Sequence, residues 1–345
     1  MKKLIGMAMV ALLLPMMISC SHGGGGGGGG VTYDNTRASG EYAYVVTVGM
    51  TSFGVEVGTI TFDGAGNGVY SAITSTATGP ITYTVTTDNT ITIHDPANGT
   101  SIVGTMRSDG SFLVGTDTTN GNEVMIVAIK KSSLVTDSTN TYLLGQFSYG
   151  TQSRANVILL EMATPNPGEA TATDLLPVLG LPGTVSYTFN DDGTFSGPSS
   201  TPSLFGAVTS DHQLAIVGDA ETIDSAEVLG GCGFKLPGSG MSTASLNGSY
   251  LLYEFMDDNV GSDAFVTIRA QVTFDGSGSG MYSEIANSKG TLDPGGSFSY
   301  AVAPDGSFLI DGAMQGVVIQ DGSVLSVIDY DDSDSSIAVM IGIKQ

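Results

Sequence analysis

Acidic side chains form the densest group of chemically capable residues in this sequence. Four carboxylates stand within six positions near the C-terminal end, at Asp329, Asp331, Asp332 and Asp334. Carboxylates at alternate positions of a tight loop converge on a hard cation such as calcium. The segment lacks the closing glutamate of a calcium-loop pattern, so a solvated acidic turn is the alternative interpretation. Calcium is therefore the one candidate cofactor, and the glycine loops that begin at Asp63 and Asp275 offer fewer ligands for it.

Residues suited to enzymatic catalysis are scarce. The three histidines, His22, His94 and His212, stand at unmatched positions of the sequence. Cys232 lies in a glycine-rich strand of an acidic chain, without the basic setting that activates a thiol, so we expect a buried structural thiol. The sequence contains no nucleophile elbow, phosphate-binding loop or zinc-protease motif. We predict that the protein is not an enzyme.

Composition excludes several other classes of protein. The chain has 345 residues, with 34 acidic and 11 basic side chains and a formal net charge of −23. Such a chain repels polyanions, so we expect no nucleic-acid partner. Two cysteines cannot build a disulfide scaffold or a four-cysteine zinc site. With 41% hydrophobic residues, the chain is too apolar to be disordered throughout.

The N-terminal segment has the pattern of a targeting signal. Lys2 and Lys3 precede an apolar run that ends at Ile18 and is too short to span a bilayer comfortably. Ser19-Cys20 follows, and this arrangement resembles the lipobox of bacterial lipoproteins. The resemblance implies a signal peptide over residues 1–19 and a Cys20 that carries acyl chains such as palmitate. An ordinary secretory signal with a chance cysteine is the alternative.

A glycine-rich tether follows the cysteine. Eight consecutive glycines, at positions 23–30, have no preferred conformation, so residues 20–39 are predicted to hold the folded part away from a membrane. Ser21, rather than aspartate, follows Cys20. By resemblance to the sorting rule of enteric bacteria, this favours the outer membrane, at its periplasmic face or at the cell surface.

The rest of the chain repeats one unit three times. Each copy opens on a glycine followed two positions later by an aromatic residue, at Gly40, Gly145 and Gly248, which lie 105 and 103 residues apart. Each copy closes on an apolar strand with a lysine at its end. We predict three repeats of about 92–97 residues within the ranges 40–133, 134–240 and 241–345.

The repeats have the periodicity of β-structure. Residues 81–85 and 298–302 alternate between large and small or polar side chains, as half-buried strands do. Turn signals such as Asp63-Gly64 and Asp109-Gly110 separate about eight short strands in the first copy. The predicted fold class is all-β, with three tandem antiparallel meanders. These resemble the lipocalin-like small β-barrels of bacterial lipoproteins, and a β-propeller is the alternative.

The second copy departs from the pattern. Only 16 residues separate Asp219 from Lys235, against 35 between Asp95 and Lys130, which predicts that this copy lacks one hairpin. Conversely, residues 163–183 form an apparent insertion rich in proline, threonine and glycine. We expect it to be a loop that covers a barrel edge or opens a barrel mouth, or a simple spacer.

These observations predict a non-enzymatic, lipid-anchored cell-envelope protein. Its repeats would mediate surface interaction or envelope structure through a protein, matrix or glycan partner. The alternative is a carrier of a small apolar ligand in a barrel interior; a small barrel full of large side chains has little room for one. The candidate contact residues are Tyr42, Tyr44, Tyr250 and Tyr253 near the repeat openings, and the alternative is that they belong to the core.

Overall fold

The computed structural model describes part of the chain from residue 32 to the C-terminus. The described residues are 32–49, 53–73, 75, 77–118, 123–133, 138–149, 154–164, 168–174, 182–197, 204–219, 228–257, 265–331 and 336–345. The predicted signal peptide, Cys20, the glycine run, Asp332 and Asp334 lie outside them. No helix in the described ranges is long and apolar enough to cross a membrane.

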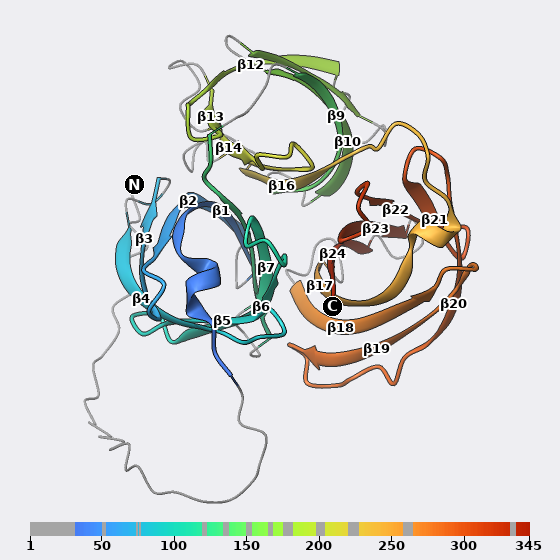
Figure 1. The fold of residues 1–345 in the computed structure, drawn as a ribbon, viewed down its shortest axis with the longest axis horizontal. Coiled ribbons are helices and arrows are strands. Elements are labelled where there is room, and N and C mark those ends of the chain that lie inside the picture. Colours follow the sequence, from blue (N-terminus) through green and yellow to red (C-terminus); the bar gives the residue numbers. More distant parts are fainter. Residues whose placement is uncertain are drawn as a thin grey trace, which may run out of the picture. The chain divides into compact units, whose positions relative to one another are not determined.

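The described chain folds into three closed antiparallel barrels of eight strands each, which confirms the all-β prediction and replaces the propeller alternative (Figure 1). A short 3-10 helix, η1 (Asn35–Ala38), precedes the first barrel. The strands of barrel 1 are β1 (Gly40–Gly49), β2 (Phe53–Phe62), β3 (Asn67–Ala72), β4 (Thr78–Val85), β5 (Thr90–Asp95), β6 (Thr100–Met106), β7 (Phe112–Asp117) and β8 (Glu123–Lys130).

Barrels 2 and 3 repeat this meander, and the first strand of each pairs with the last to close the ring. The strands of barrel 2 are β9 (Ser138–Tyr149), β10 (Arg154–Thr164), β11 (Gly168–Asp174), β12 (Pro182–Phe189), β13 (Thr194–Ser196), β14 (Leu204–Val208), β15 (Leu214–Asp219) and β16 (Val228–Lys235). A second 3-10 helix, η2 (Thr243–Ser245), leads into barrel 3. The strands of barrel 3 are β17 (Asn247–Asp257), β18 (Phe265–Asp275), β19 (Ser279–Asn287), β20 (Gly296–Val302), β21 (Ser307–Ile310), β22 (Met314–Val318), β23 (Val324–Asp331) and β24 (Ser336–Lys344).

Alternation along the strands separates the lumen from the outside. In β4, Ile81, Tyr83 and Val85 are buried while the residues between them are exposed. Strands with both faces buried do not show this alternation. In β7, for example, every residue is buried. Such strands face their own lumen on one side and other barrels on the opposite side.

The prediction of a missing hairpin in the second repeat was wrong. Barrel 2 has eight strands, and the segment 163–183, predicted to be an inserted loop, contains β11. This strand pairs with β10 through Ile158–Met162 and with β12. Alternating threonine and alanine at positions 170–173 suits a strand, and in the sequence the prolines of the segment all lie outside the bounds of β11. The unit therefore keeps its strand number, and only its loop lengths change.

The opening of the second repeat also shifts. Tyr42 of β1 pairs with Lys130, and Tyr250 of β17 pairs with Lys344. The residue that pairs with Lys235 in barrel 2 is Tyr142, so Gly145 lies within β9 rather than at its start. A glycine and an aromatic residue two positions apart are too short a motif to fix the register of a strand.

The three barrels belong to one compact unit, Thr32–Gln345. A shared hydrophobic core joins buried side chains that point away from the lumens of all three barrels. Its members include Val57 and Phe112 of barrel 1, Ile216 and Phe234 of barrel 2, and Phe255 and Ile341 of barrel 3. Because this apolar surface is buried between the barrels, each barrel stabilises the others.

Equivalent turns of the three barrels meet at one arginine. Arg107 follows β6, and its side chain is only 8% exposed. Its guanidinium donates hydrogen bonds to Asp211 in barrel 2 and to Asp321 in barrel 3, each at 2.8 Å, while Asp109 lies 3.7 Å away. Burial alone would raise the pKa of Asp211, but hydrogen bonds from Thr209 and Arg107 outweigh it and lower that pKa.

Replacement of this arginine is expected to destabilise the protein at neutral pH. Arg107→Met leaves Asp211 and Asp321 without their cation, and we expect a loss of about 1–3 kcal/mol because both carboxylates are partly exposed. Groups with a lowered pKa stabilise the fold above their unfolded pKa of about 4 and lose that effect in more acidic solution. Urea unfolding at pH 7 and pH 3 therefore tests whether the loss shrinks in acid. Lys289→Met, which removes an exposed charge, is the control, and an equal loss in both variants would contradict the prediction.

Candidate functional site

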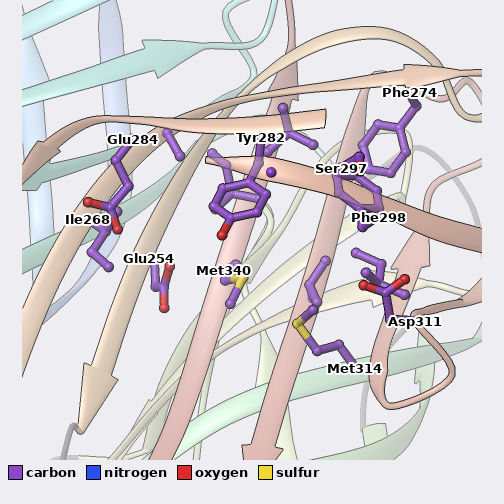
Figure 2. Close-up of a pocket in the computed structure, with 16 residues that line it drawn as sticks. Glu254, Ile268, Phe274, Tyr282, Glu284, Ser297, Phe298, Asp311, Met314 and Met340 are labelled. Atoms are coloured by element: carbon purple, nitrogen blue, oxygen red, sulfur yellow. The ribbon is translucent and has the colours of Figure 1, made fainter. Parts of the chain in front are cut away.

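Barrel 3 contains a cavity of about 420 Å³ (Figure 2). Most of the side chains that line it are apolar. They include Leu252 from β17, Val272 and Phe274 from β18, Phe298 from β20 and Met340 from β24. Cavities of this size and lining are typical of sites for small molecules.

One lumen-filling tyrosine of barrel 1 has no counterpart in the wall of this cavity. In barrel 1, Tyr44 stands two positions after Tyr42, is 1% exposed, and donates a hydrogen bond to Glu56 Oε1 at 2.8 Å. The equivalent position in barrel 3, two residues after Tyr250, is Leu252, a smaller side chain. Barrel 3 therefore has a smaller side chain than barrel 1 at this level of its lumen, beside the cavity.

A carboxyl group lies unpaired in the wall of this cavity. Glu254 of β17 is 9% exposed, and among the described residues its carboxyl forms no hydrogen bond or ion pair. Burial, followed by the nearby charges of Glu284 and Asp329, raises its pKa from 4.5 to about 8. While the cavity is empty, Glu254 is therefore protonated at neutral pH.

Glu284 of β19 is the second carboxylate near this end of the cavity. Its Oε2 atom accepts hydrogen bonds from Asn287 Nδ2 at 3.2 Å and from the Asp293 backbone nitrogen at 2.8 Å. Asp293 in turn accepts a hydrogen bond from the Tyr282 hydroxyl at 2.8 Å. The loop between β19 and β20 is thus tied to the cavity wall, which fixes where Glu284 points.

The strand geometry changes at Glu284. The pairing of β18 with β19 shifts register between Arg269 and Ala270, and Ala270 lies opposite Glu284. The ladder between β19 and β20 ends at the pair Tyr282–Gly296. A bulge redirects side chains and is common beside functional sites. The loop that carries Asp293 connects β19 to β20 beyond this end of the ladder.

The four candidate tyrosines are all buried. Tyr42 and Tyr250 donate hydrogen bonds to the carbonyl oxygens of Gly110 and Gly322, at 2.7 and 2.6 Å. Tyr44 bonds Glu56, and the Tyr253 hydroxyl lies 2.7 Å from Thr105 Oγ1 of barrel 1. In this structure they brace turns and barrel contacts instead of forming an exposed surface, because their rings fill lumens or the shared core.

The candidate calcium segment is only partly described. Asp329 lies in β23 and contributes to the electrostatic environment of Glu254. Asp331 ends that strand, whereas Asp332 and Asp334 lie outside the described residues. Within the described ranges, no group of three or more histidine, cysteine, aspartate or glutamate side chains is placed to hold a metal ion. Calcium binding at the four aspartates stays a prediction.

Cys232 and His212 are placed in the interior. The Cys232 thiol is 3% exposed, and burial raises its pKa. His212 is 7% exposed in a turn of barrel 2, where burial lowers its pKa, with a smaller contribution from Lys235. Neither residue lines the cavity of barrel 3. The sequence analysis did not single out Glu254, although a signal was present: it is the one charged residue in the run of large side chains from Tyr250 to Met256.

No protein-family model matches the chain, and no curated protein sequence does. Among solved structures, a mutant of the vaccine antigen transferrin binding protein B from Haemophilus parasuis Hp5 is 9% identical, with a TM-score of 0.28, over 91% of this chain and 76% of that chain. The isotype 1 transferrin binding protein B from serogroup B Neisseria meningitidis is 10% identical, with a TM-score of 0.25, over 89% and 77%. Likenesses this distant carry no statement about function.

Proposed function

We propose that this chain is a non-enzymatic, lipid-anchored protein of the bacterial cell envelope whose third barrel carries a small ligand with an apolar body. The observation that carries this proposal is the cavity of about 420 Å³ in barrel 3. The lipobox-like sequence before Cys20 and the glycine run after it support an anchor at the outer membrane. A tethered barrel with a hollow interior suits capture of a ligand beside a membrane.

A fluorescence titration with an uncharged naphthyl dye tests the carrier role, on the chain that starts at Thr32. We expect one dye to bind per chain, and native mass spectrometry to find adducts of a few hundred daltons on protein from the periplasm. Leu252→Tyr restores the tyrosine of barrel 1 and is expected to weaken dye binding at least tenfold. Ser249→Tyr adds the same ring on the same strand, away from the cavity lining, and is the control. Absence of dye binding to the unsubstituted chain would contradict the proposal.

Contact with an envelope protein, matrix or glycan is a second candidate function. Four large apolar side chains of barrel 3 are 43–66% exposed: Met281, Ile285, Leu292 and Leu309. Exposed apolar groups of this kind support partner contact. Retention of the chain on an envelope fraction, compared with that of a variant carrying Met281→Ser and Leu309→Ser, tests it: equal retention would remove the reason for this candidate.

A further inference from the structure

We infer that the cavity of barrel 3 selects an organic ammonium ion, that is, a ligand with one protonated amino group on an apolar body. This inference rests on the proposed carrier function and names the chemistry of its ligand. Two features of the wall carry it: the excess of carboxyl groups, and the nine-tenths buried side chain of Glu254, which has no hydrogen-bond or ion-pair partner among the described residues.

The charges of the cavity wall are all of one sign. Glu254, Glu284 and Asp311 line it, and no lysine, arginine or histidine does. In Figure 2, the Glu254 and Glu284 side chains lie on one side of the view and Asp311 on the other. A buried carboxylate needs a cation or hydrogen-bond donors to offset its lost hydration. An ammonium group supplies both, because it has a positive charge and three donors.

The remaining wall suits an organic cation better than a bare ion. Phe274, Phe298 and Met340 offer apolar and polarisable surface to the body of a ligand. The ring of Tyr282, beside the two glutamates, can face an ammonium group. The described carboxylates are not grouped as metal ligands, and the apolar part of the wall suits the hydrocarbon body of an ammonium ion.

Proton release accompanies binding in this scheme. Glu254 is protonated when the cavity is empty at neutral pH, because burial raises its pKa to about 8. When an ammonium ion binds, the Glu254 carboxyl loses its proton to solvent, and the carboxylate pairs with the ligand. The other polar groups facing it are Glu284 and Tyr282 on β19 and Asp329 on β23, whereas β18 and β24 present Ile268 and Met340. Affinity should therefore rise with pH up to about 8.

Competition against the uncharged dye tests the inference, with octylamine and octanol as probes of equal chain length. We expect octylamine to displace the dye at least tenfold more effectively than octanol at pH 8, and several-fold less effectively at pH 6 than at pH 8. Glu254→Gln should abolish the preference for the amine and keep dye binding. Asp275→Asn, in an exposed turn of barrel 3, should keep both.

The outcomes separate the two proposals. If octylamine and octanol compete equally while the dye binds, the ammonium inference is wrong and the carrier function stands. If neither the dye nor the probes bind to the unsubstituted chain, the carrier function itself is wrong. If Glu254→Gln keeps the full preference for octylamine, Glu254 is not the recognition group and the inference is also overturned.

Discussion

Glu254→Gln is expected to raise the free energy of unfolding at pH 8 by about 2–4 kcal/mol. Burial raises the pKa of Glu254 from 4.5 to about 8 in the folded protein. Each unit of such a shift corresponds to about 1.36 kcal/mol, and the full amount is not reached at pH 8 because some of the folded chains still hold the proton there. Glutamine has a similar shape and no charge, so it avoids the cost of ionisation inside barrel 3.

The pH dependence distinguishes this effect from a simple packing gain. A group whose folded pKa is raised stabilises the fold fully below its unfolded pKa, and that contribution is lost as the pH rises through the folded pKa. The unsubstituted chain should therefore lose stability between about pH 4.5 and pH 8 relative to Glu254→Gln. Urea unfolding at pH 5, 7 and 8 measures the difference, with the exposed Glu161→Gln as control. Equal slopes in the two chains would contradict the prediction.

The barrel fold was predictable because it depends on local patterns. The alternation of Ile81, Tyr83 and Val85 marks the buried face of β4. Turn sequences mark where strands end, as Asp63-Gly64 does after β2. Short turns force neighbouring strands to pair antiparallel. The prediction that the second repeat lacks a hairpin was wrong because those signals are weak there. β11 is made of small and polar residues, and the prolines on either side of it in the sequence suggested a loop.

The cavity was not predictable, because its volume depends on which side chains share one level of a lumen. The exchange of Tyr44 for Leu252 can be read from the two repeat openings, but the sequence does not show whether other side chains fill the space that it leaves. Nor could spacing alone bring Glu254 and Glu284 together, since they lie on strands separated by β18. The Tyr42 and Tyr250 hydroxyls donate to carbonyl oxygens 68 and 72 residues further along the chain, and local sequence patterns do not reveal such long-range contacts.

A glycine at one equivalent position of each barrel is expected to be irreplaceable. In barrel 1 this glycine is Gly104, three residues before Arg107. The equivalent glycines of barrels 2 and 3 are Gly206 and Gly316. A Cβ atom at Gly316 would lie 2.3 Å from Phe308 Cζ and 2.6 Å from the Ser326 carbonyl oxygen. At Gly206 the corresponding distances are 2.2 Å to Phe195 Cζ and 2.4 Å to the Ile216 carbonyl oxygen. Aromatic rings therefore pack directly on glycine backbones in barrels 2 and 3.

Gly316→Ala should consequently lower the free energy of unfolding by about 2–4 kcal/mol, since both the ring and the neighbouring strand must move. Gly54→Ala is the matched control: it lies in β2, and a Cβ atom there meets nothing within 4 Å, so its effect should be small or slightly stabilising. Adding Phe308→Leu to Gly316→Ala should recover part of the loss, because it removes the ring but not the Ser326 contact. Urea unfolding of these three variants, of Phe308→Leu alone and of the unsubstituted chain measures this coupling. A loss as small in Gly316→Ala as in Gly54→Ala would show that barrel 3 relaxes around the added methyl group, and the argument from close packing would fail.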